Sequence, residues 1–249
     1  HRTPDLFIKL DKILKRILHD QNCTISNNEL FQIFKDNKLL LLHLFKNGFF
    51  QYDQILDNDI LKNKELCTYL YPSIKPFLNE SHQKEIEEKI SELKEDLESF
   101  EKKCHKGEND SPICLLIQQD SIEDFITYVN RTNLSLSSTI NPTIFETNPI
   151  LNKKQPSLIE YAAFYGSIQI IRYLQFNKVQ LNGLLWLYAI HSKNPELIQF
   201  LEENHVVPFD QMEIIKEAII CHHNNIADYI IDNMLQQNIN KNELIEIFG

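Results

Sequence analysis

Apolar residues recur along most of the chain at intervals of three and four, the spacing that places them on one face of an α-helix. The stretch 6–18 shows this pattern first. It returns in 26–48, where Ser26 is an N-cap candidate with Glu29 three residues later, the arrangement of a capping box. Shorter segments of the same kind follow in 51–78. The pattern predicts an all-α fold.

A heavily charged segment, 81–105, carries apolar residues separated alternately by four and three positions: Ile86, Ile90, Leu93, Leu97, Phe100 and Cys104. This is the seam of a coiled coil, although it spans fewer than three heptads. The segment predicts one long charged helix at about 81–105. Its seam packs either on its own protein or on a partner helix, and the pattern leaves both readings open.

The strongest candidate for a domain boundary is the stretch KGENDSP at 106–112, which gathers Gly, Asn, Asp, Ser and Pro. It predicts an N-terminal helical region over 1–107 and a second region over 108–249. A long stretch rich in turn-forming residues, 130–157, lies inside the second region. We expect it to be an ordered excursion that packs three apolar residues onto that region: Ile140, Ile144 and Phe145.

The second region contains a repeated pattern. The stretch YAAFYGSIQIIRYLQFN begins at Tyr161, and YAIHSKNPELIQFLEEN begins 27 residues later at Tyr188. A third copy follows at an offset of 29, with Ala218 in the place of Ala189. A fixed interval is typical of stacked structural units. We expect units near 112–130, 157–183, 184–211 and 212–238, with a possible partial unit at 241–249.

The best-preserved unit resembles the ankyrin repeat, whose T-P-L-H-x-A-A-x-x-G-H stretch opens its first helix. Ala162 and Ala163 match the paired alanines, Gly166 matches the glycine, and Asn182 matches the closing asparagine. The more specific resemblance is to the divergent ankyrin-type proteins that are numerous in some protozoa. It implies an ankyrin-like α-solenoid whose repeat core comprises Ala162, Ala163, Gly166, Ile171, Leu174, Trp186, Ala189, Ile198, Leu201, Ala218 and Ile230.

The chain also departs from the ankyrin pattern. Glu160 and Leu187 stand at the histidine position, and Lys193 and His222 stand at the glycine position. The interval of 27 to 29 is shorter than the family's roughly 33 residues. We therefore expect helix pairs joined by short loops, with little of the hairpin that ordinary ankyrin repeats carry.

Composition and net charge argue against several classes of partner. The formal charge of −10 argues against nucleic acid or an anionic membrane surface as the main partner. No apolar run approaches the roughly 20 residues that cross a bilayer. Five glycines are few for a protein rich in strands, and five scattered cysteines without a C-x-x-C pair suit a reducing compartment, so we expect a cytoplasmic protein.

The sequence offers few candidates for chemistry. Cys221, His222 and His223 invite a zinc reading, but the repeat alignment places them on a turn, and no second Cys or His cluster supplies further ligands. There is no glycine-rich phosphate loop and no H-E-x-x-H. A Cys–His pair that meets only in space stays open. We expect no enzyme activity, no catalytic residue, no metal and no cofactor.

The resemblance implies a protein–protein interaction module with an unknown protein partner. Five side chains fall on first-helix positions that face the concave groove of ankyrin proteins: Tyr161, Phe164, Tyr165, Tyr188 and His191. They bind the partner, or else the excursion at 130–157 covers them. The alternative function is self-assembly into a homodimer, through the 81–105 helix or the open C-terminal end. Because the last complete unit is apolar on both faces, we also expect repeats to continue after Gly249, or that end to dock on another chain.

Overall fold

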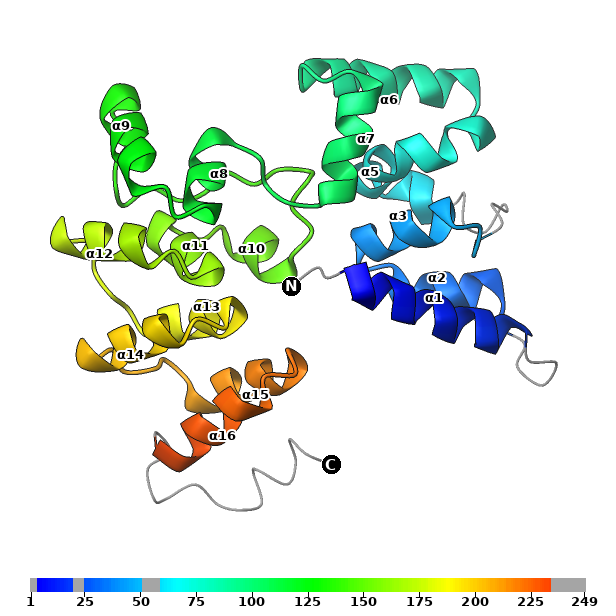
Figure 1. The fold of residues 1–249 in the computed structure, drawn as a ribbon. Helices are drawn as coiled ribbons and strands as arrows, with labels where there is room; N and C mark the ends of the chain where they lie inside the picture. The colour runs from blue at the N-terminus through cyan, green and yellow to red at the C-terminus, as the bar shows by residue number, and fades with distance from the viewer. Residues whose placement is uncertain (1–3, 20–24, 51–58, 234–249) are drawn as a thin grey trace. The chain divides into compact units, whose positions relative to one another are not determined.

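A computed structural model describes residues 4–19, 25–50 and 59–233. Over these residues the regular structure is helical, apart from one isolated antiparallel bridge between Thr139 and Ser157, so the predicted all-α class is confirmed (Figure 1). The chain divides into two compact units. Unit 1 comprises 1–110 and 142–153, and unit 2 comprises 111–141 and 154–249.

The described part of unit 1 is built from amphipathic helices and one 3-10 turn, Lys75–Phe77. The helices include α1 (Pro4–His19), α2 (Asn27–Phe34), α3 (Lys38–Lys46), α5 (Lys64–Ile74), α6 (Glu80–Glu92), α7 (Leu97–Lys106) and most of α10 (Pro149–Lys154). Helix α2 begins with the capping box expected at Ser26 and Glu29. The core gathers around α3 and α5, and the Tyr69 hydroxyl donates to the backbone oxygen of Cys104 at 2.5 Å, joining α5 to α7.

The single helix expected at 81–105 is wrong, because the chain breaks between α6 and α7. Lys94 adopts a left-handed conformation with φ of 60°, and the Asp96 side chain caps α7 by accepting from the Ser99 amide at 2.8 Å. An aspartate in this place stabilises a new helix start. Leu93 and Leu97 are 45% and 37% exposed at the break. The other four seam residues are buried in the core of unit 1: Ile86, Ile90, Phe100 and Cys104.

The excursion at 130–157 also differs from expectation, since 142–153 belongs to unit 1. The Phe145 ring packs edge-on against Phe100, with centroids 5.4 Å apart. Lys38 Nζ donates to the Ile144 backbone oxygen at 2.6 Å, which fixes the segment beside α3. Of the three apolar residues expected to pack on the second region, only Ile140 is buried in unit 2, where its amide donates to the Pro156 oxygen at 2.7 Å.

Unit 2 consists, in the part that the structure describes, of four helix pairs (Figure 1). They are α8 (Pro112–Gln118) with α9 (Ile122–Thr132), α11 (Leu158–Tyr165) with α12 (Ile168–Phe176), α13 (Leu185–Ser192) with α14 (Pro195–Glu203), and α15 (Gln211–Ile220) with α16 (Asn224–Asn233). The first helices pack in succession, α8 on α11, α11 on α13 and α13 on α15. The possible partial unit at 241–249 lies outside the described residues.

The turn inside each pair repeats one backbone conformation. Asp120, Gly166, Lys193 and His222 all have positive φ, of 50°, 72°, 54° and 56°. At Gly166 a Cβ would also be crowded, since it would lie 3.1 Å from the Cβ atoms of two residues in the next turn. Lys193 and His222 therefore hold the conformation that the glycine position requires, although neither is glycine.

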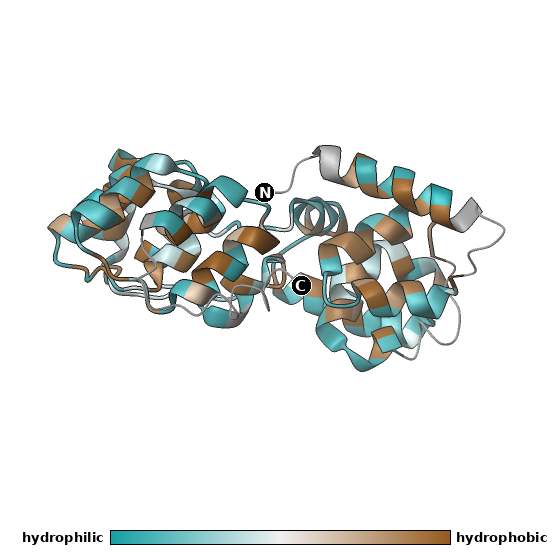
Figure 2. Cartoon of the chain, turned by 90° about the horizontal axis from the view of Figure 1, so that it is seen from below, coloured by the Kyte–Doolittle hydropathy of each residue, from teal (hydrophilic) through white to brown (hydrophobic). Residues whose placement is uncertain are grey.

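Apolar residues alternate with polar ones along the helices (Figure 2), and the buried ones form the core of unit 2. Trp186 is fully buried, and its indole N–H donates to the Val206 oxygen at 2.7 Å. The expected core positions are buried with two exceptions, Gly166 and Ile198, which are half-buried. Ile198 lines a cleft between α14 and α16, and its neighbour Leu197 is the fully buried residue.

Candidate functional site

Two of the five expected binding residues are not on the surface. Tyr161 is 1% exposed and Tyr188 is 2% exposed, because the first helices pack closely enough to enclose them. The Tyr161 hydroxyl accepts a hydrogen bond from the Gln118 side chain at 3.0 Å. Burial raises the pKa of both phenols. Neither side chain is available to a partner, which corrects the expectation for these two positions.

The other three residues are half-buried and their rings touch in a row. The Phe164 centroid lies 5.1 Å from that of Tyr165 and 4.9 Å from that of His191, whose ring is stacked on Phe164 at 24°. The row runs from the last turn of α11 to the last turn of α13. We call Phe164, Tyr165 and His191 the aromatic row.

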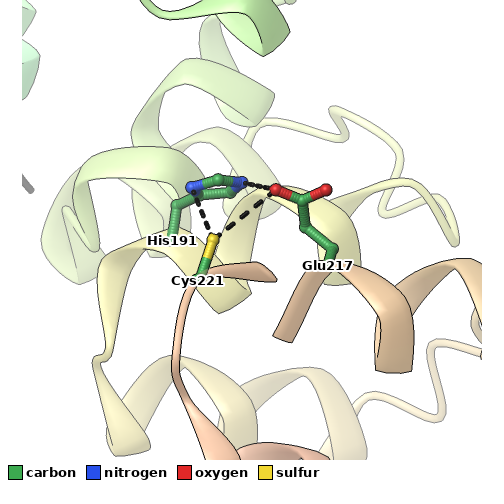
Figure 3. A group of neighbouring side chains, drawn as sticks. All are labelled: His191, Glu217 and Cys221. Atoms are coloured by element: carbon green, nitrogen blue, oxygen red, sulfur yellow. Dashed lines mark hydrogen bonds and ion pairs between the residues drawn. The ribbon is translucent and has the colours of Figure 1, made fainter. Parts of the chain in front are cut away.

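Helix α15 brings two further side chains to the end of this row (Figure 3). Cys221 Sγ lies 3.6 Å from Nδ1 of His191 and 3.5 Å from Oε1 of Glu217. His191 Nε2 lies 2.9 Å from the same Oε1. That nitrogen is buried, and the Glu217 carboxylate is its ion-pair partner. We call these three residues the His–Glu–Cys trio.

Glu217 was not among the residues that the sequence suggested, and the linear pattern did not bring Cys221 to His191. A signal was present in two parts. Glu217 and Cys221 are four residues apart, which places both on one face of a helix. The repeat offset aligns Ala189 with Ala218 and so sets α13 beside α15. The trio can be predicted only when the helical spacing and the repeat offset are considered together.

The trio has the order of a carboxylate–imidazole–thiol triad, but its electrostatics oppose a nucleophilic thiolate. Burial and the neighbouring Glu217 carboxylate raise the pKa of the Cys221 thiol to about 11. Cys221 also caps the C-terminal end of α15, where the helix dipole is negative. The contact with His191 lowers the pKa of Glu217. A site with these charges favours a cation over an activated sulfur.

Cys221, His222 and His223, the adjacent residues that suggested a zinc site, have different surroundings in the structure. Cys221 joins the trio, His222 is exposed, and His223 is buried, where burial lowers its pKa. Both histidines line the cleft between α14 and α16, a space of about 730 Å³ whose wall also includes Ile198 and Tyr229. These three residues do not converge on one point.

Comparison of the chain with models of known protein families, with curated proteins and with solved structures gave no match. Among the described helices, none combines the length and the apolar character needed to cross a lipid bilayer.

Proposed function

We propose that unit 2 is an ankyrin-like α-solenoid and that the protein is a non-catalytic protein–protein interaction module. The first support is the repeated turn conformation at Gly166, Lys193 and His222, which keeps the repeat interval of 27 and 29 residues. Two of these turns also share one backbone bond, from the residue after the left-handed position to a carbonyl five residues back: Ser167 to Ala162 at 2.9 Å, and His223 to Ala218 at 2.8 Å. A stacked repeat has this regularity.

The second support is a set of hydrogen bonds that tie the first turn to the second and the second to the third. The Ser167 hydroxyl donates to the Ile117 oxygen at 2.5 Å, and the Asp120 carboxylate accepts from two amides at the start of α12, each at 3.1 Å. One pair further on, the Asn194 side-chain amide donates to the Gly166 oxygen at 3.0 Å. These bonds join neighbouring pairs without a hairpin, which fits the short repeat interval.

The observation that carries the interaction role is the aromatic row. Aromatic rings bury a large area at low entropic cost and are enriched at binding hot spots. Three partly exposed rings that touch across two helices form a preorganised patch. The formal charge of −10 favours a protein over a nucleic acid as the partner. A cytoplasmic setting agrees with the scattered, odd number of cysteines.

The test compares two variants of the full chain as baits in a lysate of cells that express it. Phe164→Ser with Tyr165→Ser removes two rings of the row. Phe176→Ser is the matched control, since it removes an equally large ring that is 82% exposed at the end of α12. A protein retained by the wild type and the control, and reduced about tenfold or more by the double variant, supports the proposal. Equal retention by all three would refute the row as the binding surface.

The competing function, self-assembly, is separated by light scattering over a concentration series. A constant monomer mass favours the module, and a mass that rises toward the dimer favours assembly. The break at Lys94 and Asp96 removes the continuous helical seam that one assembly route requires.

A further inference from the structure

Two of the distances within the His–Glu–Cys trio match those between ligands of a tetrahedral metal ion. Zinc bonds of about 2.3 Å to sulfur and about 2.0–2.1 Å to nitrogen and oxygen place neighbouring ligand atoms roughly 3.3–3.6 Å apart. Cys221 Sγ lies 3.6 Å from Nδ1 of His191 and 3.5 Å from Oε1 of Glu217. One ligand atom from each residue can be chosen so that all three lie within 4.8 Å of one another.

The donor set and the charges suit a divalent ion of intermediate softness. Thiolate and imidazole select zinc-like ions over magnesium and calcium, and a carboxylate adds a second negative charge. The C-terminal end of α15 contributes further negative potential at Cys221. Two lysines act in the opposite direction: Lys193 on Cys221, and Lys154 on Glu217. Lys154 is itself paired with Glu213 at 3.6 Å.

The ligands are also held in place before any ion arrives. Phe164 stacks on the His191 ring and fixes its plane. His191 and Glu217 side chains are only 12% and 20% exposed, so little water has to be displaced. Nε2 of His191 pairs with Glu217 Oε1 at 2.9 Å, which turns the other ring nitrogen, Nδ1, toward the Cys221 thiol. A ring nitrogen that faces a thiol beside a carboxylate brings one nitrogen, one sulfur and one oxygen donor to the same place, a donor set that zinc accepts.

We propose that His191, Glu217 and Cys221 bind one zinc-class divalent ion, with water or an outside ligand in the fourth position. Binding displaces the thiol proton of Cys221, and the ion then links α13 to α15. It therefore clamps the third helix pair to the fourth. This differs from the expectation that the chain has no metal site, and it does not depend on the proposed partner.

The experiment measures metal binding by the full chain, with no partner present. Dialysis against Zn²⁺ followed by elemental analysis gives the stoichiometry, and Co²⁺ is the spectroscopic probe because a cobalt–thiolate bond produces charge-transfer absorption. We expect one ion per chain, and a melting temperature that rises with Zn²⁺. Cys221→Ser should lose the absorption and bind zinc about tenfold or more weakly. His222→Gln is the matched control, an adjacent exposed histidine outside the trio, and it should behave as the wild type.

Three results would overturn the proposal. They are the absence of stoichiometric zinc, a cobalt complex without charge-transfer absorption, and unchanged zinc affinity in Cys221→Ser. If Cys221→Ser fails to fold, Glu217→Gln replaces it, since that change preserves side-chain size and removes one ligand charge. Zinc affinity that is the same in Glu217→Gln and the wild type then refutes the site.

Discussion

At the scale of single residues, unit 2 keeps the left-handed backbone conformation at turns where glycine, the residue that favours it, has been replaced. Gly166 occupies the left-handed turn without strain, whereas Lys193 has a φ of 54° at the equivalent turn. A side chain in this conformation costs roughly 1 kcal/mol. Lys193 therefore departs from the ankyrin pattern in residue type only, because its backbone keeps the conformation of the glycine position.

Replacing Lys193 with glycine should therefore stabilise the protein, by about 0.5–1 kcal/mol. The reverse change, Gly166→Ala, should destabilise it by about 1–2 kcal/mol, because the new Cβ would meet Ser192 and Asn194 at 3.1 Å in a strained conformation. Urea unfolding followed by circular dichroism measures both. Destabilisation by Lys193→Gly would mean that the lysine side chain, and not the backbone, stabilises this turn.

At the scale of elements, the second helices of unit 2 present one face to their neighbours and the other to solvent, whereas α13 is buried over most of its length. Leu174 and Phe176 show the contrast within α12, since Leu174 is fully buried and Phe176 is 82% exposed. The two positions are two residues apart, so they lie on opposite sides of the same helix. A matched pair of substitutions can therefore test the packing of the stack.

Leu174→Asp should remove several kcal/mol of stability, about 3–5, because it places an unpaired charge between helices, and this is enough to unfold unit 2. Phe176→Asp should change stability by no more than about 0.5 kcal/mol. Thermal melting followed by circular dichroism distinguishes the two. Equal melting temperatures for the Leu174→Asp variant and the wild type would contradict the helix packing described for α12.

At the scale of the whole molecule, the chain leaves unit 2 after Asn141, contributes 142–153 to unit 1, and returns. The segment 106–112 is also less open than its composition indicated. Asn109 is buried and its amide donates to the Glu146 carboxylate at 3.2 Å, while Thr147 donates to the Gly107 oxygen. Residues 1–110 alone therefore lack part of their own core.

Phe145→Ala should destabilise unit 1 by about 3–5 kcal/mol, because it removes the ring that packs on Phe100. Hydrogen exchange read by mass spectrometry locates the effect. Amides of α3, α5 and α7 should exchange faster, and those of α11 to α14 should keep their wild-type protection. Faster exchange confined to unit 2 would mean that Phe145 stabilises unit 2, which would contradict its assignment to unit 1.

The sequence by itself determined the helical class, the Ser26 capping box and the interval that relates the last three helix pairs of unit 2. These depend on local spacing and on hydrogen bonds a few residues apart, so a linear pattern contains them. Tertiary structure decided the break at Lys94, the transfer of Phe145 to unit 1, the burial of Tyr161 and the meeting of His191, Glu217 and Cys221. Each depends on which faces pack together at long range. Residues 26 apart, such as His191 and Glu217, become neighbours only once α13 and α15 lie side by side.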